Sequence, residues 1–333
     1  MKYLFYAHTH TLFLTALGVV NYLKLKPEDV IFLYTRNYAN KSIKIPYKEI
    51  DLSDIFSDSM KNGEEFYFWK LNKLVTKVDD LIAEEISEDY IAYLPHVGVF
   101  LPQVLATNKY CKGIRFVEEG LNCYSSSLGI RKNTWREFLK RLYSFGVNSY
   151  KRYWFSDSPF FHEFLKKRYN LPTELFGISF NSFFSLNEKK HVVKWPNIQT
   201  GFSLDASNPI YIFEAAIEQK FASKDVYLGA VRIMIIETAK YNNYIKFHPG
   251  QSEENKNTIR QYFLERNLSI TELPFTVPFE LIMVEYPMLE IIGFNSSLLL
   301  YGKLFNHKVV SYDSLLMNDS LYIHYKKTVD YVL

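Results

Sequence analysis

Short apolar runs and amphipathic segments alternate along most of the chain. Continuous apolar runs predict buried strands, whereas apolar residues three and four positions apart predict helices. In the first half, strands are predicted at 3–7, 30–34, 90–94, 114–117 and 150–156, and helices at 11–24, 64–86, 100–107, 134–145 and 159–167. This alternation indicates an α/β fold with mainly parallel sheets.

The pattern is interrupted in two places. Residues 36–62 are polar and irregular, with strand-like pieces around 43–45, and residues 181–208 show little periodicity. A second α/β run follows, with strands at 210–213, 244–247, 268–271, 290–294 and 308–311, and helices at 220–241, 252–266, 278–286 and 296–305. We therefore expect two Rossmann-like domains, residues 1–185 and 205–320, and a helical terminal segment, 321–333, that could cross back to the first domain.

Composition narrows the class of protein. The 333 residues are 48% hydrophobic, which is ample for two cores, and the net charge of +3 is too small to indicate nucleic-acid binding. The two cysteines, Cys111 and Cys123, form no disulfide framework, so we expect free thiols in a reducing cytoplasm. No apolar run reaches membrane-spanning length. The basic segment 131–152 is either an ordinary surface helix or a peripheral contact with the inner face of a membrane.

Three apolar runs end in polar groups. They lead into Glu118-Glu119-Gly120, His248-Pro249 and Ser296-Ser297. In open α/β sheets, ligands bind beyond the carboxyl ends of the strands, where a glycine such as Gly120 permits a sharp turn. A carboxylate, an imidazole and a pair of hydroxyls therefore qualify as site residues.

Each group suits one part of a group transfer. Adjacent strand residues face opposite ways, so one glutamate enters the site, and we favour Glu119, beside the glycine, as a general base. His248 could donate a hydrogen bond or proton to a departing phosphate, and Ser296 and Ser297 could bind that phosphate at a helix N-terminus. Each has a structural alternative: a plain turn, a core histidine and an ordinary N-cap.

The turn after the first strand is a further candidate. Thr9 and His10 open a predicted helix whose free N–H groups could meet an anion, although Thr9 or Thr11 could simply cap it. The sequence contains no GxGxxG, P-loop, CxxC or HExxH motif and no DxD tripeptide, which favours a mechanism without a metal or another cofactor.

Taken in order, the three motifs resemble those of bacterial sialyltransferases and polysialyltransferases of GT-B architecture. The resemblance implies two Rossmann-like domains facing a central cleft, a CMP-sialic acid donor, a galactose-terminated glycan acceptor and inversion without a metal. It implies that Glu119 is the base and that His248 assists the leaving CMP. The remaining implied donor contacts are Ser296, Ser297, Pro249, Asn295, Glu280 for the ribose, and the backbone at Phe213 and Glu214 for cytosine. The implied acceptor or loop-orienting residues are Glu118, Gly120, Thr9 and His10.

Three other functions stay open at this point. They are a GT-B enzyme with a Kdo or hexosyl donor, a non-catalytic nucleotide- or carbohydrate-binding protein, and a nucleotide-sugar epimerase of the same two-domain architecture. The acceptor, the linkage and the oligomeric state have no readable signal in the sequence.

Overall fold

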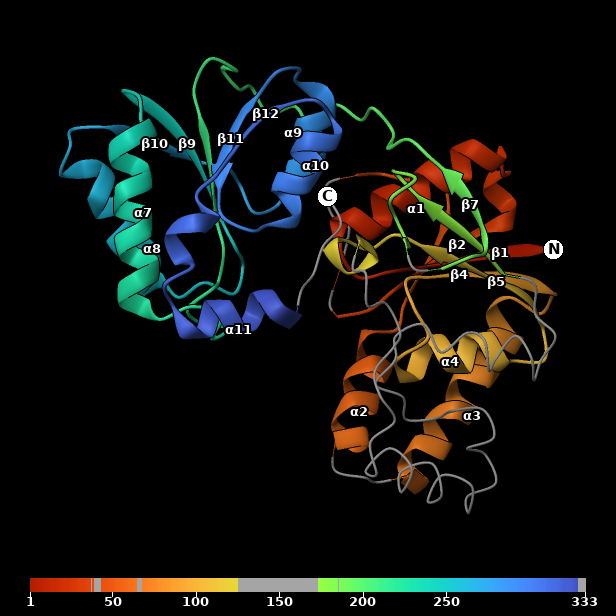
Figure 1. Cartoon of the computed structure of the whole chain (residues 1–333). Coiled ribbons are helices and arrows are strands. Elements are labelled where there is room, and N and C mark those ends of the chain that lie inside the picture. The colour runs from red at the N-terminus through yellow and green to blue at the C-terminus, as the bar shows by residue number, and fades with distance from the viewer. Residues whose placement is uncertain (37, 39–42, 65–67, 125–172, 185, 329–333) are drawn as a thin grey trace. The chain divides into compact units, whose positions relative to one another are not determined.

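The computed structural model describes residues 1–333 except 37, 39–42, 65–67, 125–172, 185 and 329–333 (Figure 1). The chain divides between Pro196 and Asn197 into two compact units, which we describe separately. The predicted elements at 134–145, 150–156 and 159–167 and the basic segment 131–152 lie outside the described residues.

The first unit contains a parallel sheet of seven strands. Its order is β3-β2-β1-β4-β5-β6-β7, and every described strand pair is parallel. The strands are β1 (Lys2–Ala7), β2 (Val30–Tyr34), β3 (Lys48–Asp51), β4 (Tyr90–Leu94), β5 (Cys111–Val117), β6 (Thr173–Gly177) and β7 (Lys189–Val192). All five residues of β2 are buried, as expected for a central strand that is covered on both faces.

Helices cover both faces of this sheet. Figure 1 shows α1 on one side and α2, α3 and α4 on the other. The helices are α1 (His10–Leu23), α2 (Ser53–Glu64), α3 (Phe68–Glu85) and α4 (Phe100–Thr107), with short 3-10 turns η1 (Pro27–Asp29) and η2 (Leu121–Tyr124). Buried Trp195 donates its indole N–H to Thr15 Oγ1 at 2.9 Å, which holds the segment after β7 against α1.

The second unit repeats the design with five parallel strands in the order β10-β9-β8-β11-β12. The strands are β8 (Ile210–Phe213), β9 (Asn242–Phe247), β10 (Ser269–Glu272), β11 (Glu290–Gly293) and β12 (Lys308–Ser311). Figure 1 shows α7 and α8 on one side of this sheet and α9 and α10 on the other. The helices are α7 (Lys224–Thr238), α8 (Glu253–Leu264), α9 (Phe279–Glu285), α10 (Ser297–Leu304) and α11 (Ser320–Thr328), with the 3-10 turn η4 (Asp313–Leu316).

The terminal helix α11 packs on the second unit. Tyr322 is buried in that unit's core, Tyr325 stacks on Phe221 with ring centroids 4.2 Å apart, and the Asp319 carboxylate accepts the Ser223 N–H. Residues 329–333, which end the segment expected to cross back, lie outside the described residues.

Three strands and one helix differ from the sequence-based expectation. Residues 36–62 are not wholly irregular, because they contain the edge strand β3 and most of helix α2, whereas the strand-like residues 43–45 form no strand. β7 lies within 181–208, and β6 was also missed. β3 and β7 lie at the two edges of the sheet and contain no buried residue, so neither has the apolar run by which a strand is recognised.

The two cysteines are buried free thiols, which confirms the prediction of no disulfide. Burial raises the pKa of Cys111 to about 12, so its thiol stays protonated at neutral pH.

Two helical glycines provide a matched test of packing. A Cβ on Gly18 in α1 would lie 2.5 Å from the Lys194 carbonyl oxygen, whereas a Cβ on Gly229 in α7 would meet nothing within 4 Å. We expect Gly18→Ala to destabilise its unit by about 1–3 kcal/mol through overpacking. Gly229→Ala should stabilise its own unit by about 0.5–1 kcal/mol through helix propensity. Thermal unfolding of both variants checks this, and equal shifts of the same sign would contradict the α1–Lys194 packing.

Candidate active site

Four strand ends of the first unit bring titratable side chains to one edge of the sheet. His8 follows β1, Arg36 follows β2, His96 follows β4, and Glu118 and Glu119 follow β5. Because the strands are parallel, their carboxyl ends meet at the same edge, where ligands bind in open α/β sheets.

Glu118 is a structural residue in this arrangement. Its carboxylate is fully buried and accepts hydrogen bonds from the Tyr124 hydroxyl (2.9 Å), the Ile178 N–H (2.8 Å) and the Ser182 hydroxyl (2.6 Å). These partners lie in η2 and in the loop after β6, so Glu118 joins both segments to the end of β5. A buried carboxylate is tolerated only with such a set of donors.

Glu119 faces the other way, toward two histidines. The Nε2 atom of His8 lies 3.4 Å from Glu119 Oε2, and the Nε2 atom of His96 lies 3.9 Å from Oε1. The His96 Nδ1 atom accepts the Gly98 N–H at 3.1 Å, so a neutral His96 ring has its proton on Nε2, the atom that faces Glu119. The one carboxylate thus lies between two imidazoles.

The electrostatics of this cluster keep Glu119 ionised. Burial by itself raises the pKa of Glu119, but His96, the hydrogen bond and charge of His8, and Arg36 outweigh burial, and the pKa is lowered. Burial lowers the pKa of His96 more than the Glu119 charge raises it. An ionised carboxylate held beside a neutral imidazole is suited to accept a proton at neutral pH.

The other residues predicted for this edge have simpler surroundings. Thr9 is the N-cap of α1, and its Oγ1 accepts the Leu12 N–H at 3.3 Å. His10 Nδ1 lies 3.1 Å from the Tyr38 hydroxyl. Gly120 has φ +143°, a conformation that side chains rarely adopt, and a Cβ there would meet nothing within 4 Å. The Thr9 cap therefore has its structural explanation, and Gly120 provides the turn beside Glu119.

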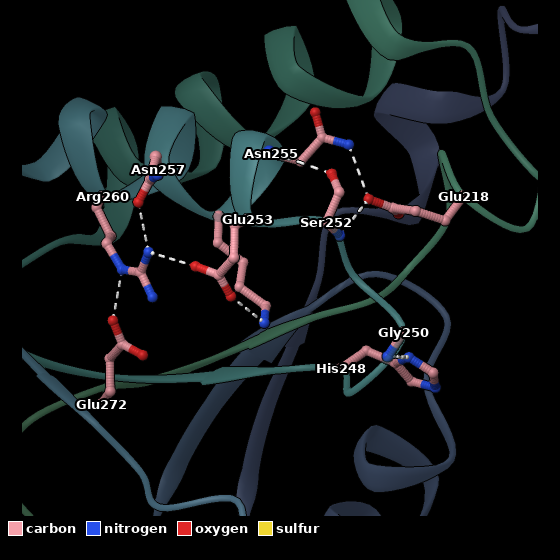
Figure 2. Close-up of polar contacts among 10 residues, drawn as sticks. Glu218, His248, Gly250, Ser252, Glu253, Asn255, Asn257, Arg260 and Glu272 are labelled. Atoms are coloured by element: carbon pink, nitrogen blue, oxygen red, sulfur yellow. Dashed lines mark hydrogen bonds and ion pairs between the residues drawn. The ribbon is translucent and has the colours of Figure 1, made fainter.

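His248 of the second unit follows β9 and is exposed (Figure 2). Its Nδ1 accepts the Gly250 N–H at 3.0 Å, which leaves Nε2 as the nitrogen that holds the proton in the neutral ring. Partial desolvation of the ring lowers the pKa of His248 more than the charge of Glu218 raises it. The ring is therefore neutral at pH 7 and offers an Nε2–H donor. Pro249 beside it is exposed.

Figure 2 also shows why the neighbouring helix end is not the phosphate site. Glu218 Oε1 accepts the Ser252 N–H (2.7 Å) and the Asn255 side-chain N–H (2.8 Å), while Ser252 Oγ accepts the Asn255 N–H (3.3 Å). A carboxylate of the chain itself thus occupies the N-terminus of α8. The Lys246 ammonium group is also occupied by the protein, because its Nζ donates to the Pro274 and Val277 carbonyls, both at 3.2 Å.

The N-terminus of α10 is another helix end at this edge. Ser296 is its N-cap, with Oγ accepting the Leu298 N–H at 3.3 Å, and Ser297 is its first residue. Both serines are partly exposed. Asn295, just before them, has a buried Nδ2 with no hydrogen-bond partner among the described residues. Glu280 lies buried in α9, and its charge acts on the pKa of Lys246.

The expectation for Glu214, after β8, is a backbone contact to a ligand, but its side chain is better placed for one. Both its backbone groups are occupied, because its N–H donates to the Tyr227 hydroxyl and the same hydroxyl donates to its carbonyl, each at 3.1 Å. The Glu214 carboxyl is available to a ligand, because its Oε1 is buried and has no hydrogen-bond partner among the described residues. Burial, aided by Asp313, raises its pKa to about 8. Phe213, the residue before it, is buried and stacks on Phe247.

The structure brings together two groups of predicted residues, one in each unit. Glu119 meets His8 and His96 in the first, while the ends of β8, β9 and β11 place Glu214, His248 and Asn295 at one edge of the second sheet. Sequence reasoning missed His8, His96 and Arg36. His96 was recognisable only as a polar residue directly after a strand, which is the signal that identified the other motifs.

Neither a metal site nor a membrane-spanning helix is found among the described residues. No three His, Cys, Asp or Glu side chains in this part of the chain are arranged to hold a metal ion. Among the same residues, no helix is both long and apolar enough to cross a bilayer.

Two doubly wound parallel units in one chain, each with polar groups at its strand ends, define a glycosyltransferase-like GT-B fold. The fold is similar to that of S. aureus MnaA in its structure with UDP, at TM-score 0.51 and 14% identity, covering 93% of this chain and 79% of that one. Methanocaldococcus jannaschii UDP-GlcNAc 2-epimerase, solved with UDP-GlcNAc and UDP, aligns at TM-score 0.47 and 11% identity over 98% of this chain and 87% of that one. No curated protein sequence matches the chain.

The family model for alpha-2,8-polysialyltransferases matches residues 15–313, which include all three motifs. The chain therefore belongs to the alpha-2,8-polysialyltransferase family and is a glycosyltransferase of the sialyltransferase type.

The two motif glutamates should differ in their effect on stability. Glu118→Gln replaces a carboxylate that accepts three hydrogen bonds, and bonds to a charged group contribute about 1.5–3 kcal/mol each. We expect a loss of roughly 2 kcal/mol or more of unfolding free energy in the first unit. Glu119→Gln should cost less, because among the described residues its carboxylate has one polar neighbour within 3.5 Å, His8 Nε2 at 3.4 Å. Denaturant unfolding compares the two, and a larger loss for Glu119→Gln would contradict these roles.

Glu214 should make the second unit less stable as the pH rises. Its carboxyl has a pKa of about 8 in the folded protein and an ordinary lower value when unfolded, so the unfolded state releases the proton first. Its stabilising effect is complete below the unfolded pKa and is lost as the pH rises through the folded value. In Glu214→Gln, the unfolding free energy should change less between pH 5 and pH 8 than in the wild type. Urea unfolding midpoints measured across this pH range check this. If the unfolding free energy of Glu214→Gln falls with pH as much as that of the wild type, another group causes the pH dependence.

Proposed function

We propose that this protein transfers sialic acid from CMP-Neu5Ac to a hydroxyl of a surface glycan, by a single inverting displacement that needs no metal. One observation is central to the proposal. An ionised carboxylate, Glu119, lies between two imidazoles at the ligand-binding edge of the first sheet, in a chain of the polysialyltransferase family.

In the proposed step, Glu119 takes the proton of the acceptor hydroxyl. The acceptor oxygen forms its bond to the anomeric carbon while the bond from that carbon to the CMP phosphate breaks, and the electron pair of that bond stays on the phosphate oxygen. The donor's own carboxylate helps to stabilise the oxocarbenium-like charge. No covalent enzyme intermediate forms, so the product has the inverted anomeric configuration.

The second unit would bind the CMP. The Nε2–H of His248 is directed away from its Gly250 contact, so it can donate to the phosphate as negative charge develops there. Because the ring is neutral at pH 7, we favour hydrogen-bond stabilisation over full proton transfer. Ser296, Ser297 and the N–H groups of α10 would bind the same phosphate.

The rest of the donor would lie along the adjacent strand ends. The Glu214 carboxyl and the Asn295 amide both offer unpartnered buried atoms to the nucleoside, and Glu280 remains the candidate for the ribose. One oxygen of the Glu214 carboxyl accepts the Asn295 backbone N–H, so Oε1, protonated in the neutral carboxyl, would donate to the N3 atom of cytosine.

The family also suggests a second acceptor. Sequence motifs led us to a terminal galactoside, whereas an α-2,8 linkage joins one sialic acid to another, so a sialic acid-terminated chain is the alternative acceptor. Both acceptors therefore belong in the test.

Release of CMP from CMP-Neu5Ac, measured with galactose-terminated and with sialic acid-terminated glycans, tests the proposal. We expect turnover by the wild type and losses of about 10²–10⁴-fold in Glu119→Gln, the range for a general base. His248→Ala should lose about 10²–10³-fold, the range for one hydrogen-bond donor to developing charge. Product NMR should show inversion, and retention would rule out the single displacement.

Glu88→Gln and His324→Ala serve as matched controls, because both residues are exposed and neither is among the proposed site residues. Wild-type rates in Glu119→Gln would reject Glu119 as the base. Absence of CMP binding, with binding of UDP-sugars instead, would reject the donor and favour an epimerase or hexosyltransferase.

A further inference from the structure

The contacts of Glu119 point to a role for the two histidines beside it, and this inference deepens the proposed function. His8 is 8% exposed, and its Nδ1 is buried without a hydrogen-bond partner among the described residues. Its Nε2 faces Glu119. His96 has its Nδ1 occupied by the Gly98 N–H, so its Nε2 also faces Glu119. Both rings are thus oriented toward the same carboxylate.

We propose that His8 and His96 are positioning residues for Glu119, which hold its carboxylate from two sides so that the proton acceptor stays in place and ionised. The two rings come from different strand ends, β1 and β4, while Glu119 comes from β5. Since β1, β4 and β5 are neighbours in the sheet, any ligand at this edge meets the three residues as one unit.

The proposal depends on all charged and titratable groups that act on this carboxylate. Arg36 adds positive charge from the end of β2. Tyr6 and Cys123 also interact electrostatically with Glu119, and both keep their protons because burial raises their pKa values. Glu118 lies next to Glu119 in the chain, but its carboxylate is occupied by its own three donors. The groups that favour the charged form of Glu119 are therefore the two histidines and Arg36.

The chain permits variants that remove one nitrogen at a time. In His96→Asn, the amide can still accept the Gly98 N–H, but no group remains in the place of Nε2. His8→Asn removes the nitrogen that faces Glu119. His8→Gln keeps an N–H near that position but has no titratable ring. His191→Asn is the matched control, because His191 Nε2 lies 3.5 Å from a different carboxylate of the same unit, that of Glu174.

The first readout is the pH dependence of kcat/KM for CMP release. Losing a stabilising partner lets burial raise the pKa of Glu119, so the acid limb should move upward by about one pH unit for His8→Asn and for His96→Asn. On the acid side of the limb, well below pH 5, activity should then fall roughly tenfold, with recovery at neutral pH. His8→Gln should restore part of the shift, and His191→Asn should leave the limb unchanged. A loss that is equal at every pH would overturn the proposal.

The second readout does not need turnover, so it separates this inference from the proposed function. Histidine resonances, assigned by their absence in His8→Asn and His96→Asn, can be titrated by NMR in the wild-type protein and in Glu119→Gln. Because the Glu119 charge raises the pKa of His96, the variant should keep His96 neutral to lower pH. An unchanged His96 titration would show that the pair is not coupled, whether or not CMP-Neu5Ac proves to be the donor.

Discussion

The burial of Glu118 is the constraint on which the first site depends. Three donors from η2 and the loop after β6 hold its carboxylate at the end of β5. Because neighbouring residues at a strand end face opposite sides, fixing Glu118 inward turns Glu119 outward, toward His8 and His96. The two adjacent glutamates therefore have different roles: Glu118 connects two loops, and Glu119 faces the candidate active site.

The strength of the local apolar pattern decides which elements could be predicted from sequence. Central strands and helices have strong apolar patterns, so the α/β architecture, the carboxylate motif and the preference for Glu119 were readable from the chain. The edge strands β3 and β7 were not, since they bury too little to show an apolar run. His96 was missed for another reason: nothing local to β4 reveals that parallel pairing places its end beside that of β5.

The second unit shows the same limit at its helix ends. Both α8 and α10 begin at a serine N-cap, so local sequence does not separate the two helix ends. Only the fold reveals that Glu218, distant in sequence, occupies the N-terminus of α8. A carboxylate already in that position repels a phosphate, so the positive end of α10 is the better of the two.

Buried polar atoms without partners support a binding role for the same edge. Glu214 Oε1, Glu218 Oε2, Asn295 Nδ2 and both amide atoms of Gln251 are buried and unpartnered among the described residues. Each such atom costs about 1–3 kcal/mol, so a domain selected for stability alone would not accumulate them along three adjacent strand ends. A ligand that supplies both donors and acceptors removes that cost when it binds. The proposed nucleoside donor would do so with its base edge and ribose hydroxyls, so its binding would satisfy these buried atoms.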